Sequence, residues 1–154
     1  MKRVYTGSVT ATGGRNGHIQ SNDNIIDLPL ALVDGLGKSD SKKGTNPEQL
    51  FAGAYAACFE TSLLAVAAAQ GIRIEKSSVT AEIGINKAND GFHLSAELTI
   101  SLSGIDDPTR DKLVNGAHLV CPYSRAIRNN VNVSFTINYD DPQYEKKGNA
   151  LLTL

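Results

Sequence analysis

Residues 46–71 read NPEQLFAGAYAACFETSLLAVAAAQG, and this stretch decides the fold. Asn46 suits the N-cap of a helix, Pro47 suits the first helical position, and Gln49 follows the cap by three residues, as in a capping box. Gly71 is the residue type that ends many helices in a left-handed conformation. The pattern therefore predicts one helix of about 24 residues, roughly 36 Å long.

Small side chains lie on nearly every face of this predicted helix. They are Ala52, Gly53, Ala54, Ala56, Ala57, Ala65, Ala67, Ala68 and Ala69. A helix that is apolar all round is either buried in protein or spans a membrane. Glu60, Thr61 and Ser62 occupy its centre, where a charge is costly in lipid. We therefore expect a buried central helix, wrapped by sheet and packed against a second copy of the chain.

The region before the helix predicts a β-hairpin. Two short strand-like runs, residues 4–12 and 17–21, are separated by Gly13 and Gly14. Two adjacent glycines favour a turn between strands. Arg15 is therefore expected at or just after the hairpin tip.

The region after the helix alternates apolar and polar residues, which is typical of strands. The expected strands cover residues 79–85, 92–102 and 131–137, with a hairpin turn at residues 89–91. Asp107 and Pro108 open a second helix, and Pro122 interrupts it. Hairpins kept apart from helices indicate an α+β fold of antiparallel sheets, not a parallel doubly wound sheet.

Length and composition limit the class of protein. The chain has 154 residues and a mass of 16.4 kDa, which fits one domain over residues 1–154. A formal net charge of −1 gives no global attraction to nucleic acid, so no nucleic-acid partner is expected. The N-terminus shows no apolar signal region and the chain has only two cysteines, so we expect a cytoplasmic protein without a disulfide framework.

Cys58 and Cys121 are the first candidates for chemistry. Cys58 lies in the middle of the predicted helix, and Cys121 directly precedes the proline that breaks the second helix. Their spacing is not that of a Cys-x-x-Cys dithiol. Two interpretations stay open: both are small buried hydrophobic residues, as most free cysteines are, or one is a reactive thiolate held by a nearby cation.

Arg15, Arg125 and Arg128 are the available cations, although a single arginine is more often a solvated surface charge. Glu48 either orients an arginine through a bidentate pair or simply occupies a first turn, where the helix dipole favours an acid. Glu48 and Cys58 are ten positions apart, roughly 15 Å along a straight helix, so they cannot share an arginine within one helix. Either the helix breaks after its first turn, or Glu48 serves a Cys58 of another subunit.

The sequence gives less support to a metal site, a nucleotide-binding loop or a nucleophilic serine. His118 and Cys121 stand three positions apart and would face one way on a helix, as half of a metal site does. No second matching pair accompanies them in the sequence. Glycine-rich nucleotide fingerprints and a nucleophilic serine elbow are missing from the sequence as well.

Four short blocks stand in order along the chain. They are Gly13-Gly14-Arg15-Asn16-Gly17-His18, Asn46-Pro47-Glu48-Gln49-Leu50-Phe51, Ala56-Ala57-Cys58-Phe59 and Val120-Cys121-Pro122-Tyr123-Ser124. Each is weakly specific alone. Together, and across essentially the whole chain, they resemble the organic hydroperoxide resistance proteins of the Ohr/OsmC family. Arg125 departs from the asparagine that this family's pattern has after the serine.

The resemblance implies an OsmC-like fold, an intertwined homodimer of α+β protomers whose antiparallel sheets wrap long central helices. It also implies roles. Cys58 resembles the peroxidatic cysteine, whose thiolate attacks an alkyl or lipid hydroperoxide and becomes a sulfenic acid, and Cys121 resembles the resolving cysteine of a Cys58–Cys121 disulfide. Arg15 corresponds to the arginine that stabilises the thiolate, and Glu48 to the acid that holds this arginine.

The resemblance further implies a dithiol reductant, such as a lipoylated protein, and chemistry that requires no cofactor or metal. The polar centre of the helix, with Glu60, argues against a membrane partner. Two alternatives remain open. One is the osmotically induced OsmC branch, with the same chemistry and a different peroxide preference. The other is a non-catalytic ligand-binding dimer whose cysteines are inert core residues.

Overall fold

The computed structural model describes residues 2–37, 43–138 and 150–153, and gives only the backbone for residues 150–153. The chain divides into two compact units, Met1–Leu50 and Phe51–Leu154, and each is described by itself. The single domain expected over residues 1–154 stays a prediction.

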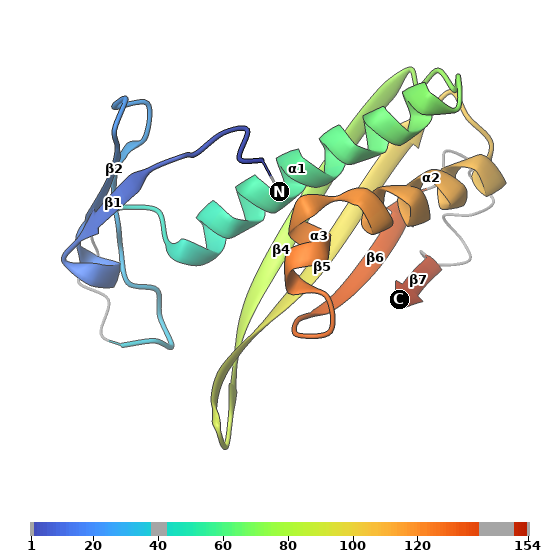
Figure 1. The fold of residues 1–154 in the computed structure, drawn as a ribbon. Coiled ribbons are helices and arrows are strands. Elements are labelled where there is room, and N and C mark those ends of the chain that lie inside the picture. Colours follow the sequence, from blue (N-terminus) through green and yellow to red (C-terminus); the bar gives the residue numbers. More distant parts are fainter. Residues whose placement is uncertain (1, 38–42, 139–149, 154) are drawn as a thin grey trace. The chain divides into compact units, whose positions relative to one another are not determined.

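The first unit carries a three-stranded antiparallel sheet in the order β1-β2-β3 (Figure 1). Its strands are β1 (Val9–Thr12), β2 (His18–Ser21) and β3 (Asp27–Pro29). The predicted hairpin is confirmed, with a single 3₁₀ turn, Gly14–Asn16, at its tip. Gly13 and Gly14 have φ values of 79° and 61°, a left-handed conformation that glycine adopts without penalty. Arg15 therefore lies on a tightly folded tip.

The helix α1 (Pro47–Ala69) has the ends that its sequence predicts. The Asn46 Oδ1 atom accepts a hydrogen bond of 2.8 Å from the Gln49 N–H group, which makes Asn46 the cap. At the other end Gly71 has a φ of 67°, and the N–H groups of Gly71 and Ile72 donate to the carbonyls of Ala68 and Ala67. This pairing is a Schellman motif, so Gly71 ends α1 as expected.

The second unit holds a four-stranded sheet in the order β4-β5-β6-β7. The strands are β4 (Lys76–Ala88), β5 (Gly91–Ser103), β6 (Asn132–Asn138) and β7 (Ala150–Thr153). The expectation of antiparallel sheets is wrong for one pair, because β5 and β6 are parallel. Helices α2 (Asp107–Val120) and α3 (Pro122–Ile127) form the crossover that a parallel connection requires. The fold is α+β, with one antiparallel and one mixed sheet.

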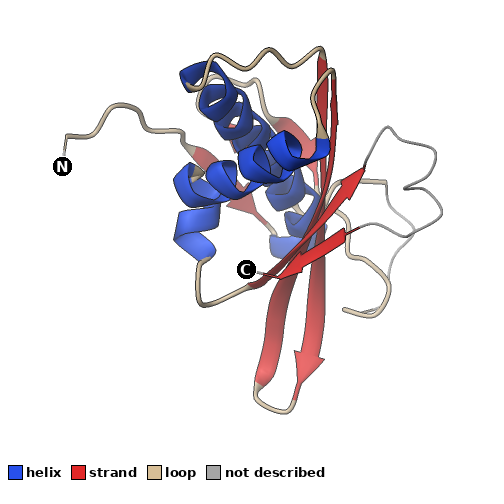
Figure 2. Ribbon diagram, turned by 90° about the vertical axis from the view of Figure 1, so that its right-hand side faces the viewer, coloured by secondary structure: helices blue, strands red, loops and turns tan. Residues whose placement is uncertain are grey.

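The core of the second unit lies between one stripe of α1, the inner side of α2 and one face of the sheet, with the helices on that face (Figure 2). Alternate residues of β5 and β6 supply the sheet side, since successive strand residues point to opposite faces. The buried cluster comprises Tyr55, Phe59, Leu63, Ala96, Leu98, Ile100, Leu102, Val114, Ala117, Cys121, Val133, Phe135 and Ile137.

Within the single chain α1 is buried on one side only, and the expected burial of its other side against a second copy stays a prediction. Its buried residues follow one stripe, whereas the opposite face, which includes Gly53, Ala57, Leu64, Ala65 and Ala68, is exposed. By length and composition α1 is also able to cross a membrane, although 28% of that apolar window is buried within the protein. Core helices of water-soluble proteins satisfy the same criterion, so this finding is weak support for a membrane span.

A buried arginine joins the end of β5 to the start of α2. Arg110 is 1% exposed. Its Nη2 and Nε atoms donate to the Leu102 carbonyl at 2.8 and 3.2 Å, and its Nη1 atom contacts the carboxylate of Asp107. The guanidinium group thus satisfies backbone oxygens where the chain leaves the sheet, which buried polar groups require.

Replacing Arg110 with methionine tests this role. Arg110→Met retains much of the side-chain volume but leaves the Leu102 carbonyl without its donor, so we expect the free energy of unfolding to fall by about 2–3 kcal/mol. Urea denaturation measures the change. Lys112→Met, at an exposed position of the same helix, is the control, and an equally small effect of both substitutions would contradict the prediction.

Candidate functional site

The first cluster of candidate residues pairs Arg15 with Glu48. Arg15 Nη1 donates to Glu48 Oε2 at 2.8 Å and Arg15 Nη2 donates to Glu48 Oε1 at 2.7 Å. Two parallel N–H···O bonds fix both the position and the plane of a guanidinium group. The bidentate pair that the sequence suggested for Glu48 is therefore present, and it links the hairpin tip to the first turn of α1.

Each partner changes the proton affinity of the other. The hydrogen bond to Glu48 raises the pKa of Arg15, and the hydrogen bond from Arg15 lowers the pKa of Glu48. The Glu48 side chain is 14% exposed and that of Arg15 is 36% exposed. Glu48 is therefore ionised at neutral pH, and its charge compensates the guanidinium group while holding it in place.

The second cluster brings the two cysteines together. Both thiols are free, and the Cys121 thiol donates to the Cys58 sulfur across 3.7 Å. Cys121 is fully buried, whereas Cys58 is only partly buried. Cys121 ends α2 and also precedes the first residue of α3, because Pro122 has no N–H group with which to continue α2.

The residues after Cys121 attach α3 to α1 at the same place. The backbone N–H group of Tyr123, in the first turn of α3, lowers the pKa of the Cys58 thiol, because such N–H groups have no partner within the helix. The hydroxyl groups of Ser124 and Tyr55 form a buried hydrogen bond of 2.8 Å. The Tyr123 and Tyr55 rings stack with their centroids 6.1 Å apart. The sequence analysis did not identify the Tyr55–Ser124 pair, because no local pattern relates residues so far apart.

Burial disfavours the charged form of Cys58. Desolvation is the largest influence and raises the pKa of the Cys58 thiol, the Tyr123 N–H group lowers it, and the neighbouring Cys121 raises it. The direction is thus toward a neutral thiol. A thiolate at this position requires a cation close to the sulfur.

Arg128, one of the three candidate cations, has another contact. Its Nη2 atom donates to the His118 carbonyl at 3.0 Å, in the last turn of α2. Arg125 lies at an exposed position. Arg15 belongs to the other compact unit.

The continuity of α1 decides between the two explanations for the separation of Glu48 from Cys58. The helix runs without a break over Pro47–Ala69. The alternative that α1 breaks after its first turn is therefore wrong. The remaining hypothesis is that Glu48 acts at Cys58 of another subunit.

His118 and Cys121 do not form part of a larger metal-ligand cluster in the described regions. Across residues 2–37 and 43–138, no group of three or more His, Cys, Asp or Glu side chains is placed to hold a metal ion. His118 is 7% exposed, and its ring packs edge-on against Phe135 with centroids 5.0 Å apart.

Comparison with known proteins finds relatives that match most of this chain in sequence and in structure. Residues 38–136 match the family described as OsmC-like protein. The organic hydroperoxide resistance protein of Xanthomonas axonopodis pv. citri is 42% identical over 88% of this chain and 96% of its own. A crystal structure of an organic hydroperoxide resistance protein from Legionella pneumophila matches with a TM-score of 0.84 at 42% identity, covering 90% of this chain and 100% of that one. The structure of OhrB from Bacillus subtilis matches with a TM-score of 0.81 at 39% identity, over 87% and 98% of the two chains.

The Arg15–Glu48 pair predicts an acid-sensitive contact. Because the folded-state pKa of Glu48 is depressed, the pair stabilises the fold above the unfolded-state pKa, and this stabilisation is lost as the pH falls through the folded-state value. We expect ¹³C NMR to show the Glu48 carboxyl titrating below the ordinary glutamate range. Arg15→Gln should raise the pKa of Glu48 toward the ordinary glutamate value, whereas Arg3→Gln should leave it unchanged. An unchanged Glu48 titration in Arg15→Gln would contradict the pairing.

Proposed function

The chain belongs to the OsmC-like family and, within it, to the organic hydroperoxide resistance proteins, and from this premise we propose that it is a cytoplasmic, thiol-dependent peroxidase that reduces organic hydroperoxides to alcohols. The observation that carries the proposal is the 3.7 Å separation of the only two sulfur atoms of cysteine in the chain. Cys58 is only partly buried and Cys121 is fully buried, which supports Cys58 as the peroxide-reactive residue and Cys121 as the resolving one.

The proposed first step takes place at Cys58. Its thiolate attacks the distal oxygen of the hydroperoxide, so an S–O bond forms while the O–O bond breaks. The alkoxide leaves, takes up a proton and becomes the alcohol, and Cys58 becomes a sulfenic acid. The peroxide is reduced by two electrons, which the sulfur supplies.

The second step is resolution by Cys121. Its sulfur attacks the Cys58 sulfenic acid, the S–S bond forms, the S–O bond breaks and the oxygen leaves as water. A disulfide has an S–S distance of about 2.05 Å, so the two sulfurs need to approach by roughly 1.7 Å. A dithiol reductant, for which we propose a lipoylated protein, then exchanges with the disulfide and restores both thiols.

The Arg15–Glu48 pair supplies the missing cation in this proposal. A guanidinium group against Cys58 opposes the effect of burial and favours the thiolate. The same group stabilises the negative charge that develops on the leaving alkoxide, which favours the transition state over the ground state. Glu48 acts as a positioning residue, since it holds Arg15 through two hydrogen bonds.

We further propose that the working form is a homodimer in which this pair serves Cys58 of the second copy. Two observations support it. The unbroken α1 keeps Glu48 away from Cys58 of the same helix. The exposed face of α1 consists mainly of small side chains, which permit close approach of another element.

Cysteine substitutions test the assignment of the two thiols. Cys58→Ser should abolish turnover of an alkyl hydroperoxide, because the attacking sulfur is lost. Cys121→Ser should consume about one equivalent of peroxide and then accumulate sulfenic or further oxidised Cys58. Mass spectrometry and peroxide consumption measure both. Normal turnover by Cys58→Ser would overturn the peroxidase, and no thiol loss from the unmodified protein would favour a binding protein with inert cysteines. Faster turnover of hydrogen peroxide than of the alkyl hydroperoxide would instead favour the osmotically induced branch.

Arg15→Gln tests the source of the cation. We expect the Cys58 pKa to rise and the rate of the peroxide step at neutral pH to fall about a hundredfold or more, as loss of one preorganised donor typically does. Part of the rate should return as the pH is raised, because more thiolate forms. Thiolate absorbance and stopped-flow kinetics measure the two effects, with Arg3→Gln as the control. An unchanged Cys58 titration would remove Arg15 from the site.

A further inference from the structure

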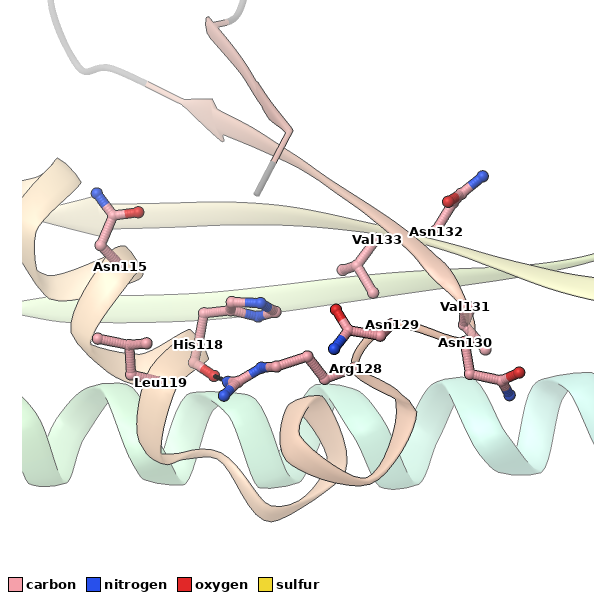
Figure 3. Close-up of a pocket in the computed structure, with 9 residues that line it drawn as sticks. All are labelled: Asn115, His118, Leu119, Arg128, Asn129, Asn130, Val131, Asn132 and Val133. Carbon is pink, nitrogen blue, oxygen red and sulfur yellow. Dashed lines mark hydrogen bonds between the residues drawn. The ribbon is translucent and has the colours of Figure 1, made fainter.

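The second unit contains a pocket that the proposed peroxidase chemistry does not use. Its volume is about 620 Å³, within the range of roughly 300–1,000 Å³ that is usual for small-molecule sites. The described lining comes from the last turns of α2, the loop after α3 and the start of β6 (Figure 3). It comprises Asn115, His118, Leu119, Arg128, Asn129, Asn130, Val131, Asn132 and Val133, and neither cysteine belongs to it.

Arg128 places a positive charge in this wall, and no acidic side chain among residues 2–37 and 43–138 forms an ion pair with it. Arg128 donates one hydrogen bond to the His118 carbonyl, which caps the end of α2 (Figure 3). A guanidinium group has five N–H donors, so this structural contact leaves others for a ligand. None of the ion pairs given for the described residues includes Arg128, and none of the described lining residues is acidic. The charge of the pocket therefore favours an anion.

Two buried polar atoms of the lining have no hydrogen-bond partner among the described residues. They are His118 Nδ1, in a side chain that is 7% exposed, and Asn115 Oδ1. Buried polar groups are normally paired. The His118 ring nitrogen donates to an anion in the tautomer that carries its proton at Nδ1, and Asn115 Oδ1 accepts from a bound water or hydroxyl group.

The loop that closes this side of the pocket is held in an uncommon conformation. Asn129 has a φ of 62°, a left-handed value that side-chain-bearing residues adopt infrequently. Figure 3 shows its carboxamide directed toward the His118 ring. An amide donor thus lies on the same side of the pocket as the arginine and the histidine.

The remaining described lining combines three aliphatic residues with Asn130 and Asn132. Leu119, Val131 and Val133 supply apolar surface beside the polar groups. Inorganic phosphate or another fully polar anion leaves such surface without a partner. We infer that this pocket binds a small carboxylate with an aliphatic chain, its carboxylate at Arg128, His118 and Asn129 and its chain along Leu119, Val131 and Val133. This inference does not depend on the peroxidase proposal, because it involves neither cysteine.

A titration with octanoate tests the inference, with amide NMR spectra of the full chain as the readout. Saturable shifts confined to residues 115–119 and 128–133 are expected. Arg128→Gln should weaken binding about tenfold or more, because a hydrogen bond to a charged group is lost. Leu119→Glu, at a position 63% exposed, should weaken it as well by placing a like charge at the rim. Lys112→Gln, which removes an exposed charge elsewhere on α2, should leave binding unchanged.

Two comparisons complete the test. Octanamide, which has the same chain without the charge, should bind at least tenfold more weakly, and the Cys58→Ser/Cys121→Ser double variant should bind octanoate as the unmodified protein does. Equal affinity for octanamide, equal affinity for inorganic phosphate, or unchanged octanoate binding by both Arg128→Gln and Leu119→Glu would each overturn the inference. Loss of octanoate binding in the cysteine double variant would move the ligand to the thiol site and would overturn it too.

Discussion

The contact between the Cys121 thiol and the Cys58 sulfur depends on one proline. Pro122 has no N–H group, so α2 ends at Cys121 and the chain turns at once into α3. This turn brings groups from three of the four residues 121–124 to α1: the Cys121 sulfur contacts the Cys58 sulfur, the Tyr123 N–H group lowers the pKa of Cys58, and the Ser124 hydroxyl bonds to Tyr55. The sulfurs are therefore held by backbone geometry and by a buried hydroxyl pair as well as by hydrophobic packing.

Burial and charge act in opposite directions at this contact. Packing Cys58 against Cys121 and α3 raises the pKa of the Cys58 thiol, which works against a thiolate. Each pKa unit corresponds to about 1.4 kcal/mol, so a well-placed cation is able to compensate for partial burial. The bidentate pair with Glu48 makes Arg15 more rigid but reduces its field at long range, because the two charges nearly cancel. In the proposed mechanism the guanidinium group therefore has to touch the sulfur with an N–H group that Glu48 does not use.

Local chemistry made parts of this structure predictable. The ends of α1 follow from Asn46, Pro47 and Gly71, each of which acts within one turn of the helix, and the hairpin tip follows from two adjacent glycines. Helix-end residues and turn glycines do not predict which distant segments of the chain pack together. The parallel pairing of β5 with β6, the short strand β3 and the Tyr55–Ser124 bond depend on tertiary packing, and the sequence analysis missed them. The resemblance of four sequence blocks to a known family linked Arg15 with Glu48 and Cys58 with Cys121. Only the structure shows the distances between the atoms of these pairs.

The two faces of α1 explain why its composition is so rich in alanine. Aromatic and leucine side chains fill the stripe that packs on the sheet, and Glu60, the one acid at mid-helix, accepts a hydrogen bond of 2.7 Å from Ser77 of β4. A charge in the middle of an apolar helix is thereby anchored on the sheet side, and the opposite face keeps only small side chains beside Leu64. In the proposed homodimer, this face of small side chains permits a second copy to approach the backbone of α1 closely. The same unbroken helix carries Cys58 and fixes its separation along the helix from Glu48 in the first turn. The continuity of α1 is therefore one reason for the proposal that Arg15 and Glu48 serve Cys58 of a second copy.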